Sequence, residues 1–289
     1  MVRVGTCAWA DHTGVYPSWL PPADRLPYYA RFFPLVEADS TFYRPATAAQ
    51  CARWAERTPA HFRFHVKAHR SLTWHDRANR PRGTAIAVAA QTLTVAVAPL
   101  AQAGKLSALH LQFAPWFVAG QETTDYLRAT CTALADLPVA VEFRHRSWFA
   151  DPARTEATLA LLRDLGATHT CCDEPQRGDA CVPTVLAVTT PRLAVVRLHG
   201  RNAATWYVRG THSGERFNYR YSPQELAQWR PPLRTLGGQA ADVHVLFNNN
   251  HEDGAVRNAY EMASLLNLAY PDPWRGSLLG GTGASDPRG

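Results

Sequence analysis

Lysine is almost absent from this chain. Lys67 and Lys105 are the only two, although lysine and arginine together number 30. Arginine therefore carries nearly all of the positive charge. Its planar guanidinium suits bidentate contact with carboxylate or phosphate, whereas lysine is a point charge whose pKa shifts readily on burial. The net charge of +6 and the pI near 9.1 permit an anionic small molecule or a nucleic acid as partner, without specifying either.

Other absences exclude whole classes of protein. The six cysteines form no Cys-x-x-Cys pair, so reduced thiols are expected rather than disulfides or a structural zinc site. No signal peptide is evident, and no run is expected to reach the roughly 18 to 20 apolar residues of a membrane helix. We therefore expect a soluble, cytoplasmic protein with no membrane partner. No G-x-G-x-x-G follows the first strand pattern and no P-loop occurs, which argues against a doubly wound nucleotide-binding sheet.

Strand-like and helix-like segments alternate along the chain. Alternating or apolar patterns predict strands over 2–7, 35–39, 62–68, 106–112, 139–144, 167–172, 193–198 and 242–247. Helices are predicted near 22–33, 47–57, 85–102, 122–135, 151–165, 222–236 and 255–268, and none is assigned to 173–192. This order predicts an α/β fold, a TIM (β/α)8 barrel in a single domain over 1–270, with irregular connections after strands 6 and 7. The Gly- and Pro-rich segment 271–289 is expected to be a flexible tail.

In a barrel, one face of each strand meets the helices and the other points inward. The apolar residues fit the helix side: Val36, Ala38, Phe64, Val66, Leu109, Leu111, Val141, Phe143, Val196 and Leu198. The interior is then left with polar residues: Glu37, Asp39, His65, Lys67, His110, Gln112, Glu142, Arg144, His169, Asp173, Arg197, His199, His244 and Asn248. An ion-pair network filling the barrel is one interpretation. Because polar groups end most strands on one side, we favour a ligand site there.

Side-chain chemistry separates the roles within this ring. We expect Arg144, Arg197 and Arg201, with Lys67 beside them, to hold a phosphate or carboxylate. Glu37 and Glu142 are candidates for general acid and base, and His199 is a second candidate for proton transfer. Asp39 or Asp173 would orient a basic partner or share a metal.

Loop residues of the same face extend the predicted site. Aromatic rings that could stack on a sugar or base are Trp9, Tyr43, Trp148, Trp206 and Tyr207, and amides follow the last strand at Asn248 and Asn249. A divalent metal held by carboxylate and imidazole is a further option, but no residue is assigned to it. Cys171 and Cys172 point to opposite faces of a strand and cannot both bind one ion easily.

Several motifs resemble one known family. They are Gly5-Thr6-Cys7-Ala8-Trp9, Val36-Glu37-Ala38-Asp39-Ser40-Thr41-Phe42-Tyr43, Phe64-His65-Val66-Lys67-Ala68, Val141-Glu142-Phe143-Arg144-His145-Arg146-Ser147-Trp148, Val196-Arg197-Leu198-His199-Gly200-Arg201 and Phe247-Asn248-Asn249. Together they resemble the YecE-like family, domain of unknown function seventy-two, over residues 2–268. The resemblance implies a TIM barrel with its site at the C-terminal ends of the strands, but no established reaction. This chain has Cys7, Ala8, Asp39 and His69 where the family pattern more often has Ser, Gly, Asn and Pro.

Three functions remain open at this stage. The first is an enzyme acting on a phosphate ester or nucleic-acid component, as a hydrolase or isomerase. The second is a nucleic-acid binding protein without catalysis, with strongly salt-dependent affinity. The third is a carbohydrate enzyme whose Glu37 and Glu142 lie about 5 to 10 Å apart. The substrate, metal dependence and oligomeric state are left undecided.

Overall fold

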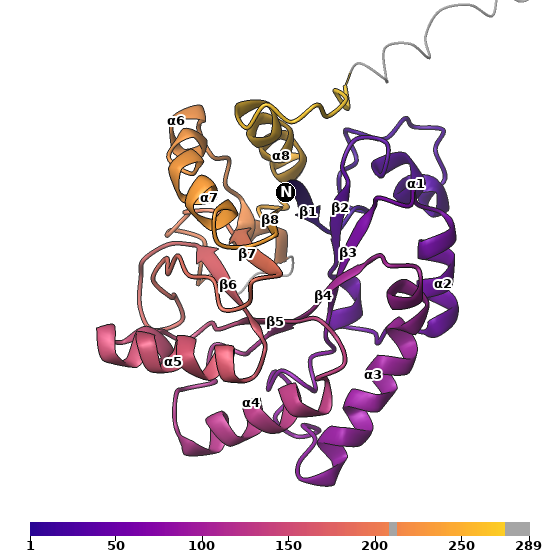
Figure 1. The fold of residues 1–289 in the computed structure, drawn as a ribbon. Coiled ribbons are helices and arrows are strands. Elements are labelled where there is room, and N and C mark those ends of the chain that lie inside the picture. The colour runs from indigo at the N-terminus through magenta and orange to yellow at the C-terminus, as the bar shows by residue number, and fades with distance from the viewer. Residues whose placement is uncertain (208–212, 275–289) are drawn as a thin grey trace, which may run out of the picture.

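The computed structural model describes residues 1–207 and 213–274, and within them eight parallel strands close into a barrel in chain order (Figure 1). The strands are β1 (Val2–Cys7), β2 (Leu35–Ala38), β3 (Arg63–Lys67), β4 (Leu106–Gln112), β5 (Val139–Glu142), β6 (Thr168–Asp173), β7 (Leu193–Leu198) and β8 (Asp242–Phe247). β8 pairs with β1, so no strand edge is left open. The predicted TIM barrel is confirmed.

Helices surround the strands (Figure 1). They are α1 (Arg25–Tyr29), α2 (Ala48–Glu56), α3 (Thr84–Gln102), α4 (Gln121–Ala133), α5 (Pro152–Asp164), α6 (Pro223–Ala227), α7 (Arg230–Gly237) and α8 (Gly254–Leu265). Short 3-10 turns lie at η1 (Pro22–Asp24), η2 (Ser40–Phe42), η3 (Arg146–Phe149) and η4 (Ser213–Phe217). As predicted, the connection from β6 to β7 has no helix.

Two predicted helices are shorter than expected. The segment 22–33 forms only η1 and the five-residue α1. The segment 222–236 divides into α6 and α7, because Pro231 and Pro232 supply no backbone N–H and fit only a first turn. The capping box at the start of α6 is present, with Ser222 accepting from the Glu225 amide and Glu225 accepting from the Ser222 amide.

The helix α3 corrects one expectation. By length and composition alone it could cross a membrane, and 28% of its most apolar window is buried inside the protein. It packs on the barrel through Ile86, Ala90, Leu93, Val97 and Leu100, as the outer helix that follows β3. A single apolar helix of this kind is weak evidence for a membrane, because the core helix of a soluble protein can have the same length and composition.

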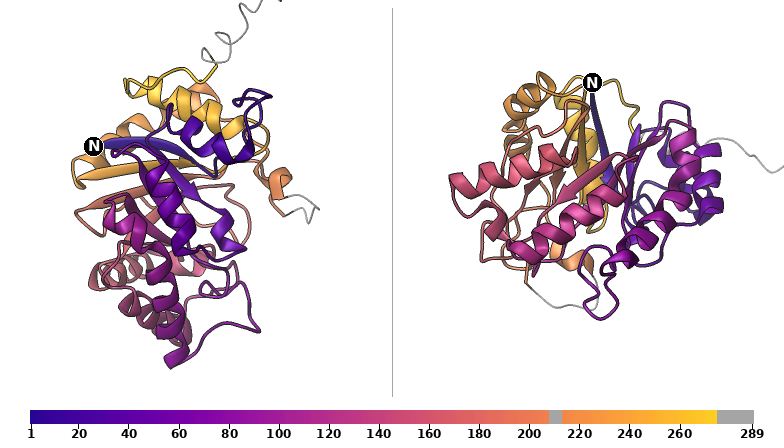
Figure 2. Two further views of the ribbon diagram at one scale, coloured as in Figure 1. Left: turned by 90° about the vertical axis from the view of Figure 1, so that its right-hand side faces the viewer. Right: turned by 60° about the horizontal axis from the view of Figure 1, so that its bottom comes forward.

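The barrel interior changes character along its axis. Its apolar residues include Ala108, Ala140, Leu193 and Val195, and the buried His65 and His244 lie in register with Ala108 and Val195. Polar and charged side chains fill the end where the strands terminate. In the side view of Figure 2, η4 lies at the end of the barrel opposite the N-terminus. The loops that follow the strands therefore cover the polar end.

The chain beyond 270 is partly described. Residues 275–289 of the predicted tail lie outside the described residues. Trp274, which falls within that predicted tail, packs edge-on against Tyr260 of α8 at 6.0 Å and lies 4.8 Å from the Arg257 guanidinium. The packed part of the chain therefore continues a few residues past the predicted boundary.

Candidate active site at the barrel mouth

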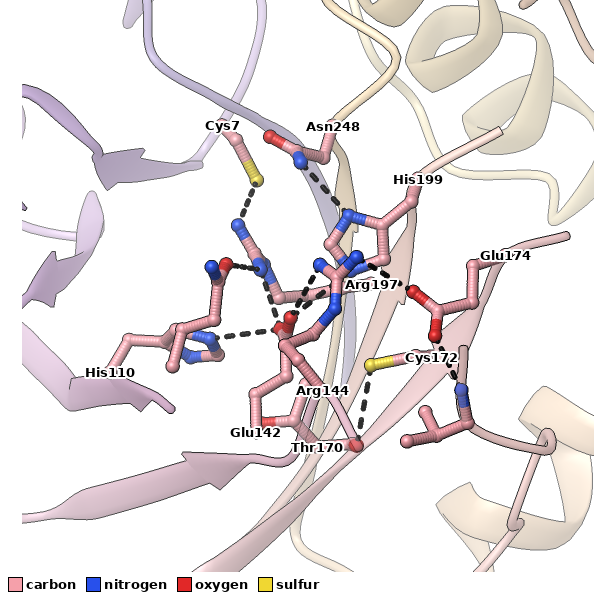
Figure 3. Close-up of polar contacts among 12 residues, drawn as sticks. Cys7, His110, Glu142, Arg144, Thr170, Cys172, Glu174, Arg197, His199 and Asn248 are labelled. Carbon is pink, nitrogen blue, oxygen red and sulfur yellow. Dashed lines mark hydrogen bonds and ion pairs between the residues drawn. The ribbon is translucent and has the colours of Figure 1, made fainter. Parts of the chain in front are cut away.

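Arg197 of β7 is the centre of the buried polar cluster (Figure 3). Its guanidinium is fully buried. One terminal nitrogen donates to Glu142 and to Gln112 Oε1, the latter at 3.0 Å, and the other donates to Glu37 Oε1 at 2.8 Å and Cys7 Sγ at 3.3 Å. Both terminal nitrogens thus have partners inside the protein. Arg197 holds β2 and β5 together across the barrel rather than presenting a free fork to a ligand.

Glu142 of β5 is surrounded by donors. Besides Arg197, it is approached by Arg144 Nη1 at 3.2 Å, His110 Nε2 at 3.1 Å and His199 Nε2 at 3.3 Å. Burial alone would raise the pKa of this carboxyl, but Arg197 and His199 hold it well below its ordinary value. Glu142 therefore remains ionised, and such a carboxylate accepts a proton poorly. This environment suits an anchoring role better than the predicted acid–base role.

Glu174 is the carboxyl group whose pKa lies near neutrality, and it was not among the predicted site residues. Its Oε2 lies 3.0 Å from Arg144 Nη2, and its Oε1 accepts from the Val182 amide at 2.6 Å. Glu174 is 2% exposed, and burial raises its pKa to about 7. A carboxyl with this pKa can both give and take a proton at physiological pH.

Glu174 was missed because the inward face of β6 was assigned wrongly. Cys172 pairs in register with the inward-facing Arg197, whereas Asp173 pairs with the outward-facing Leu198. His169 likewise pairs with the outward-facing Val141. His169 and Asp173 therefore lie outside the barrel, and the inward side chains of this strand end in Glu174. The segment Thr-His-Thr-Cys-Cys-Asp has no apolar alternation, so its sequence does not reveal the register.

Three other predicted binding residues belong to the outer layers. Arg201 donates from Nε to both oxygens of Asp173 at 3.0 Å, outside the barrel. Asn249 donates to Asn258 Oδ1 at 2.9 Å. Trp148 is buried and stacks on Phe143 at 4.3 Å. These contacts direct the three side chains away from Arg197, and Arg201 lines a surface pocket together with Asp173 and Glu174.

Lys67 and Asp39 lie together at the mouth, as the sequence predicted. Lys67 Nζ donates to Asp39 Oδ1 at 2.6 Å and sits 4.7 Å from the Phe42 ring. Burial would raise the pKa of Asp39, but Lys67 lowers it. Asp39, which replaces the asparagine of the family pattern, is therefore neutralised by the adjacent Lys67, so both charges are paired.

His199 sits above Glu142 in a fixed orientation. Asn248 Nδ2 donates to His199 Nδ1 at 2.9 Å, which places the imidazole proton on Nε2, facing Glu142. Burial lowers the pKa of His199 to about 3. The imidazole is thus neutral at pH 7 and turns its Nε2 toward Glu142 without carrying charge.

The β7–α6 connection brings aromatic rings over this cluster. The buried Trp206 ring lies 5.2 Å from the Arg144 guanidinium, and Phe217 of η4 lies 6.1 Å from the His199 ring. Trp206 and Phe217 meet edge to face at 6.0 Å. Of the predicted stacking residues, Trp206 is therefore the one whose ring contacts the charged cluster.

The remaining predicted aromatics are peripheral. Trp9 packs edge-on against Trp54 at 5.4 Å. Tyr43 is 64% exposed, and Tyr207 is 45% exposed with its hydroxyl donating to the Arg177 carbonyl. Tyr43 and Tyr207 present ring surface to solvent, so stacking on a ligand stays a prediction for them.

Positive charge gathers around the opening. Arg216 of η4 is half-buried, and burial together with the Arg144 guanidinium lowers its pKa. No carboxylate within residues 1–207 and 213–274 forms an ion pair with Arg216, and residues 208–212 contain no Asp or Glu. On the other side of the mouth, burial, Lys67 and Arg144 lower the pKa of His75 to about 3. The opening is therefore more cationic than the interior below it.

Comparison with known proteins places this barrel in a family. The family described as protein of unknown function DUF72 matches residues 3–278. The chain belongs to the DUF72 family. The UPF0759 protein YunF of Bacillus subtilis is 38% identical over 273 residues, which are 93% of this chain and 96% of that protein. The resemblance of its motifs to the YecE-like family is thus confirmed.

Solved DUF72 structures share the fold. A DUF72 family protein from Enterococcus faecalis is 30% identical, with a TM-score of 0.84 over 94% of this chain and 97% of the other. A DUF72 family protein from Thermotoga maritima is 29% identical, with a TM-score of 0.80 over 92% and 99% of the two chains. These relatives establish family and fold without assigning a reaction.

Within residues 1–207 and 213–274, two groups of side chains have the composition of metal ligands. Glu142, Cys172 and His199 form one, but Glu142 already has several donors. Burial raises the pKa of the Cys172 thiol well above its ordinary value, so this thiol would have to lose its proton to bind a metal. Glu37, His65 and His110 form the other group, deeper in the barrel.

Proposed function

We propose that this DUF72 protein is an enzyme that binds an anionic substrate, a phosphate ester or a nucleic-acid component, at the C-terminal mouth of its barrel. The observation that carries the proposal is Arg216: a half-buried guanidinium whose pKa the charge of Arg144 lowers, and which forms no ion pair with a carboxylate of the described residues. Arg144 already has Glu142 and Glu174 as partners, whereas the partly desolvated Arg216 has no carboxylate partner within the described residues. A phosphate bound at Arg216 would supply that counter-charge.

The residues below the mouth support proton transfer through Glu174. Arg144 contacts both Glu142 and Glu174, so an anion drawn to Arg144 lies next to the carboxyl that titrates near neutrality. We therefore assign Glu174 the general acid or base role that was first predicted for Glu37 and Glu142. In this assignment Lys67 orients and polarises the substrate as a cation, and His199, whose Nε2 faces Glu142, keeps that carboxylate in position.

The carbohydrate alternative has less support. Glu37 and Glu142 both bind the same guanidinium of Arg197, and both are fully buried. A glycosidase needs one carboxyl of the pair to hold a proton while the other faces the sugar or a water. A nucleic-acid binding protein without catalysis remains the stronger rival, because the cationic mouth serves it equally well.

The test measures anion binding and turnover with a matched pair of variants. The probes are p-nitrophenyl phosphate, bis(p-nitrophenyl) phosphate and a fluorescent single-stranded oligonucleotide, each at low and moderate salt. Arg216→Gln removes one charge-assisted contact, worth about 1.5 to 3 kcal/mol, and should weaken binding or kcat/KM at least about tenfold. Arg128→Gln removes the same charge from an exposed position on α4 and should change nothing.

The outcomes separate the hypotheses. Turnover that falls in Arg216→Gln, and not in the control, supports the enzyme. Steeply salt-dependent oligonucleotide binding with no turnover supports the binding protein instead. If the wild-type protein binds none of the three probes at low salt, the anion site itself is refuted.

The cytosol is the compartment we propose. All six cysteines are buried and free. Unpaired thiols in this number fit a reducing environment, where disulfides are rare.

A further inference from the structure

Glu37, His65 and His110 lie together in the barrel interior, and each has one side-chain atom that makes no hydrogen bond within the described residues. These atoms are Glu37 Oε2, His65 Nδ1 and His110 Nδ1. All three side chains are fully buried. Leaving one such atom unsatisfied costs about 1 to 3 kcal/mol, so three together in one place require an explanation.

The geometry of the group is close to that of a metal site. One ligand atom from each residue lies within 4.8 Å of the other two, and Glu37 Oε2 is 3.9 Å from His110 Nδ1. Ligands bonded to one tetrahedral ion at about 2.1 Å lie about 3.4 Å apart. A small inward rotation of the side chains would bring them to that separation.

The register of the strands explains why Glu37, His65 and His110 lie close together. Glu37 of β2 pairs directly with His65 of β3, and His110 of β4 pairs with Lys67, one inward position further along β3. The three ligands thus come from three consecutive strands and the same inward face. Rigid strands of this kind hold ligands more precisely than loops do.

The opposite atom of each side chain is held by a second residue. His110 Nε2 faces Glu142 Oε2 at 3.1 Å, His65 Nε2 faces His244 Nδ1 at 2.9 Å, and Glu37 Oε1 accepts from Arg197. The Glu142 carboxylate can only accept, so the proton of a neutral His110 lies on Nε2 and its Nδ1 carries a free lone pair. A carboxylate behind a histidine is the arrangement that orients metal-binding imidazoles in proteins.

From these contacts we infer that Glu37, His65 and His110 bind a divalent transition metal ion, with zinc as the best fit. Two imidazoles and one carboxylate suit zinc or iron(II), whereas magnesium and calcium prefer oxygen ligands only. Three protein ligands leave a coordination position open.

This inference goes beyond the proposed function and does not depend on it. The proposed anion site uses Arg216 and Arg144 at the mouth, whereas the metal ligands lie on β2, β3 and β4. Metal binding is measured without any substrate, so either proposal can fail while the other stands.

The experiment titrates zinc into the full-length protein after removal of metal with a chelator. Isothermal titration calorimetry and elemental analysis after desalting should give one equivalent of tightly bound zinc. His65→Gln and His110→Gln should each weaken binding at least about a hundredfold. His61→Gln removes an imidazole from the exposed loop before β3 and should bind zinc like the wild-type protein.

Two spectroscopic measurements keep the test valid if a variant fails to fold. Far-ultraviolet circular dichroism verifies that each variant retains the barrel. X-ray absorption of the zinc-loaded wild-type protein needs no variant and should show two imidazole ligands and one or more oxygen ligands. The inference is refuted if the wild-type protein binds no stoichiometric zinc, or if the absorption spectrum shows sulfur or no imidazole. A crystal structure grown with zinc that shows a water molecule bonded to the three atoms would also overturn it.

Discussion

Replacing Glu174 with glutamine should change how the stability of the protein depends on pH. Burial raises the pKa of Glu174 from its ordinary value of 4.5 to about 7 in the folded protein. Between these two values the folded state holds a proton that the unfolded state has lost. Stability due to this group is therefore fully present below about pH 4.5 and is lost as the pH rises to about 7. At about 1.4 kcal/mol per pH unit, the total loss is about 3 kcal/mol.

Glu174→Gln keeps the shape and the acceptor oxygen of the neutral acid but cannot ionise. The free energy of unfolding of the wild-type protein, minus that of the variant, should thus fall by about 3 kcal/mol between pH 4.5 and pH 8. Urea denaturation at several pH values measures this difference. Glu156→Gln serves as control, because Glu156 is 66% exposed in a surface pair with Arg163. A difference that stays constant with pH for Glu174→Gln, or that grows in the opposite direction, would refute the argument that Glu174 is held neutral by burial.

Two further substitutions test other parts of the structure. Arg197→Met should lower the free energy of unfolding by about 3 to 5 kcal/mol, because it leaves two buried carboxylates without their shared guanidinium. Guanidinium chloride denaturation measures this change. A loss under about 1 kcal/mol would contradict that role of Arg197. Ala8→Gly should raise stability by about 0.5 kcal/mol. Ala8 has φ of 72°, which costs an L-residue about 1 to 2 kcal/mol, while glycine loses about 0.5 to 1 kcal/mol more entropy on folding. Ala10→Gly, at an exposed position, is the control and should destabilise the protein. A lower thermal midpoint for Ala8→Gly than for the wild-type protein would show the strain argument to be wrong.

Strand periodicity predicted the barrel well because most strands alternate clearly. In β2 and β3, apolar side chains at every second position identified the helix-facing side, and Glu37, His65 and Lys67 point inward as expected. The same pattern placed Glu142 and Arg197 correctly. Alternation is a local property of the chain, so it can be read without knowing the fold.

Other features depend on contacts that no local pattern contains. The register of β6 is set by its pairing with β7, which explains why Asp173 was chosen in place of Glu174. The proximity of Arg216 to Arg144 arises only when the β7–α6 connection folds over the mouth. Trp148 resembled a loop residue but is drawn into the outer layer by Phe143. Long-range contacts of this type decide which candidate residues meet, and sequence alone supplies only the candidates.

The guanidinium of Arg197 joins Glu37, 160 positions away in the chain, to Glu142, 55 positions away. Until β7 takes its place, the two carboxylates face each other inside a partly formed sheet with no cation between them. Burial of both carboxylates without that guanidinium would cost several kcal/mol. The polar interior can therefore be buried at low cost only when β7 is in place, which favours the complete barrel over one that lacks this strand.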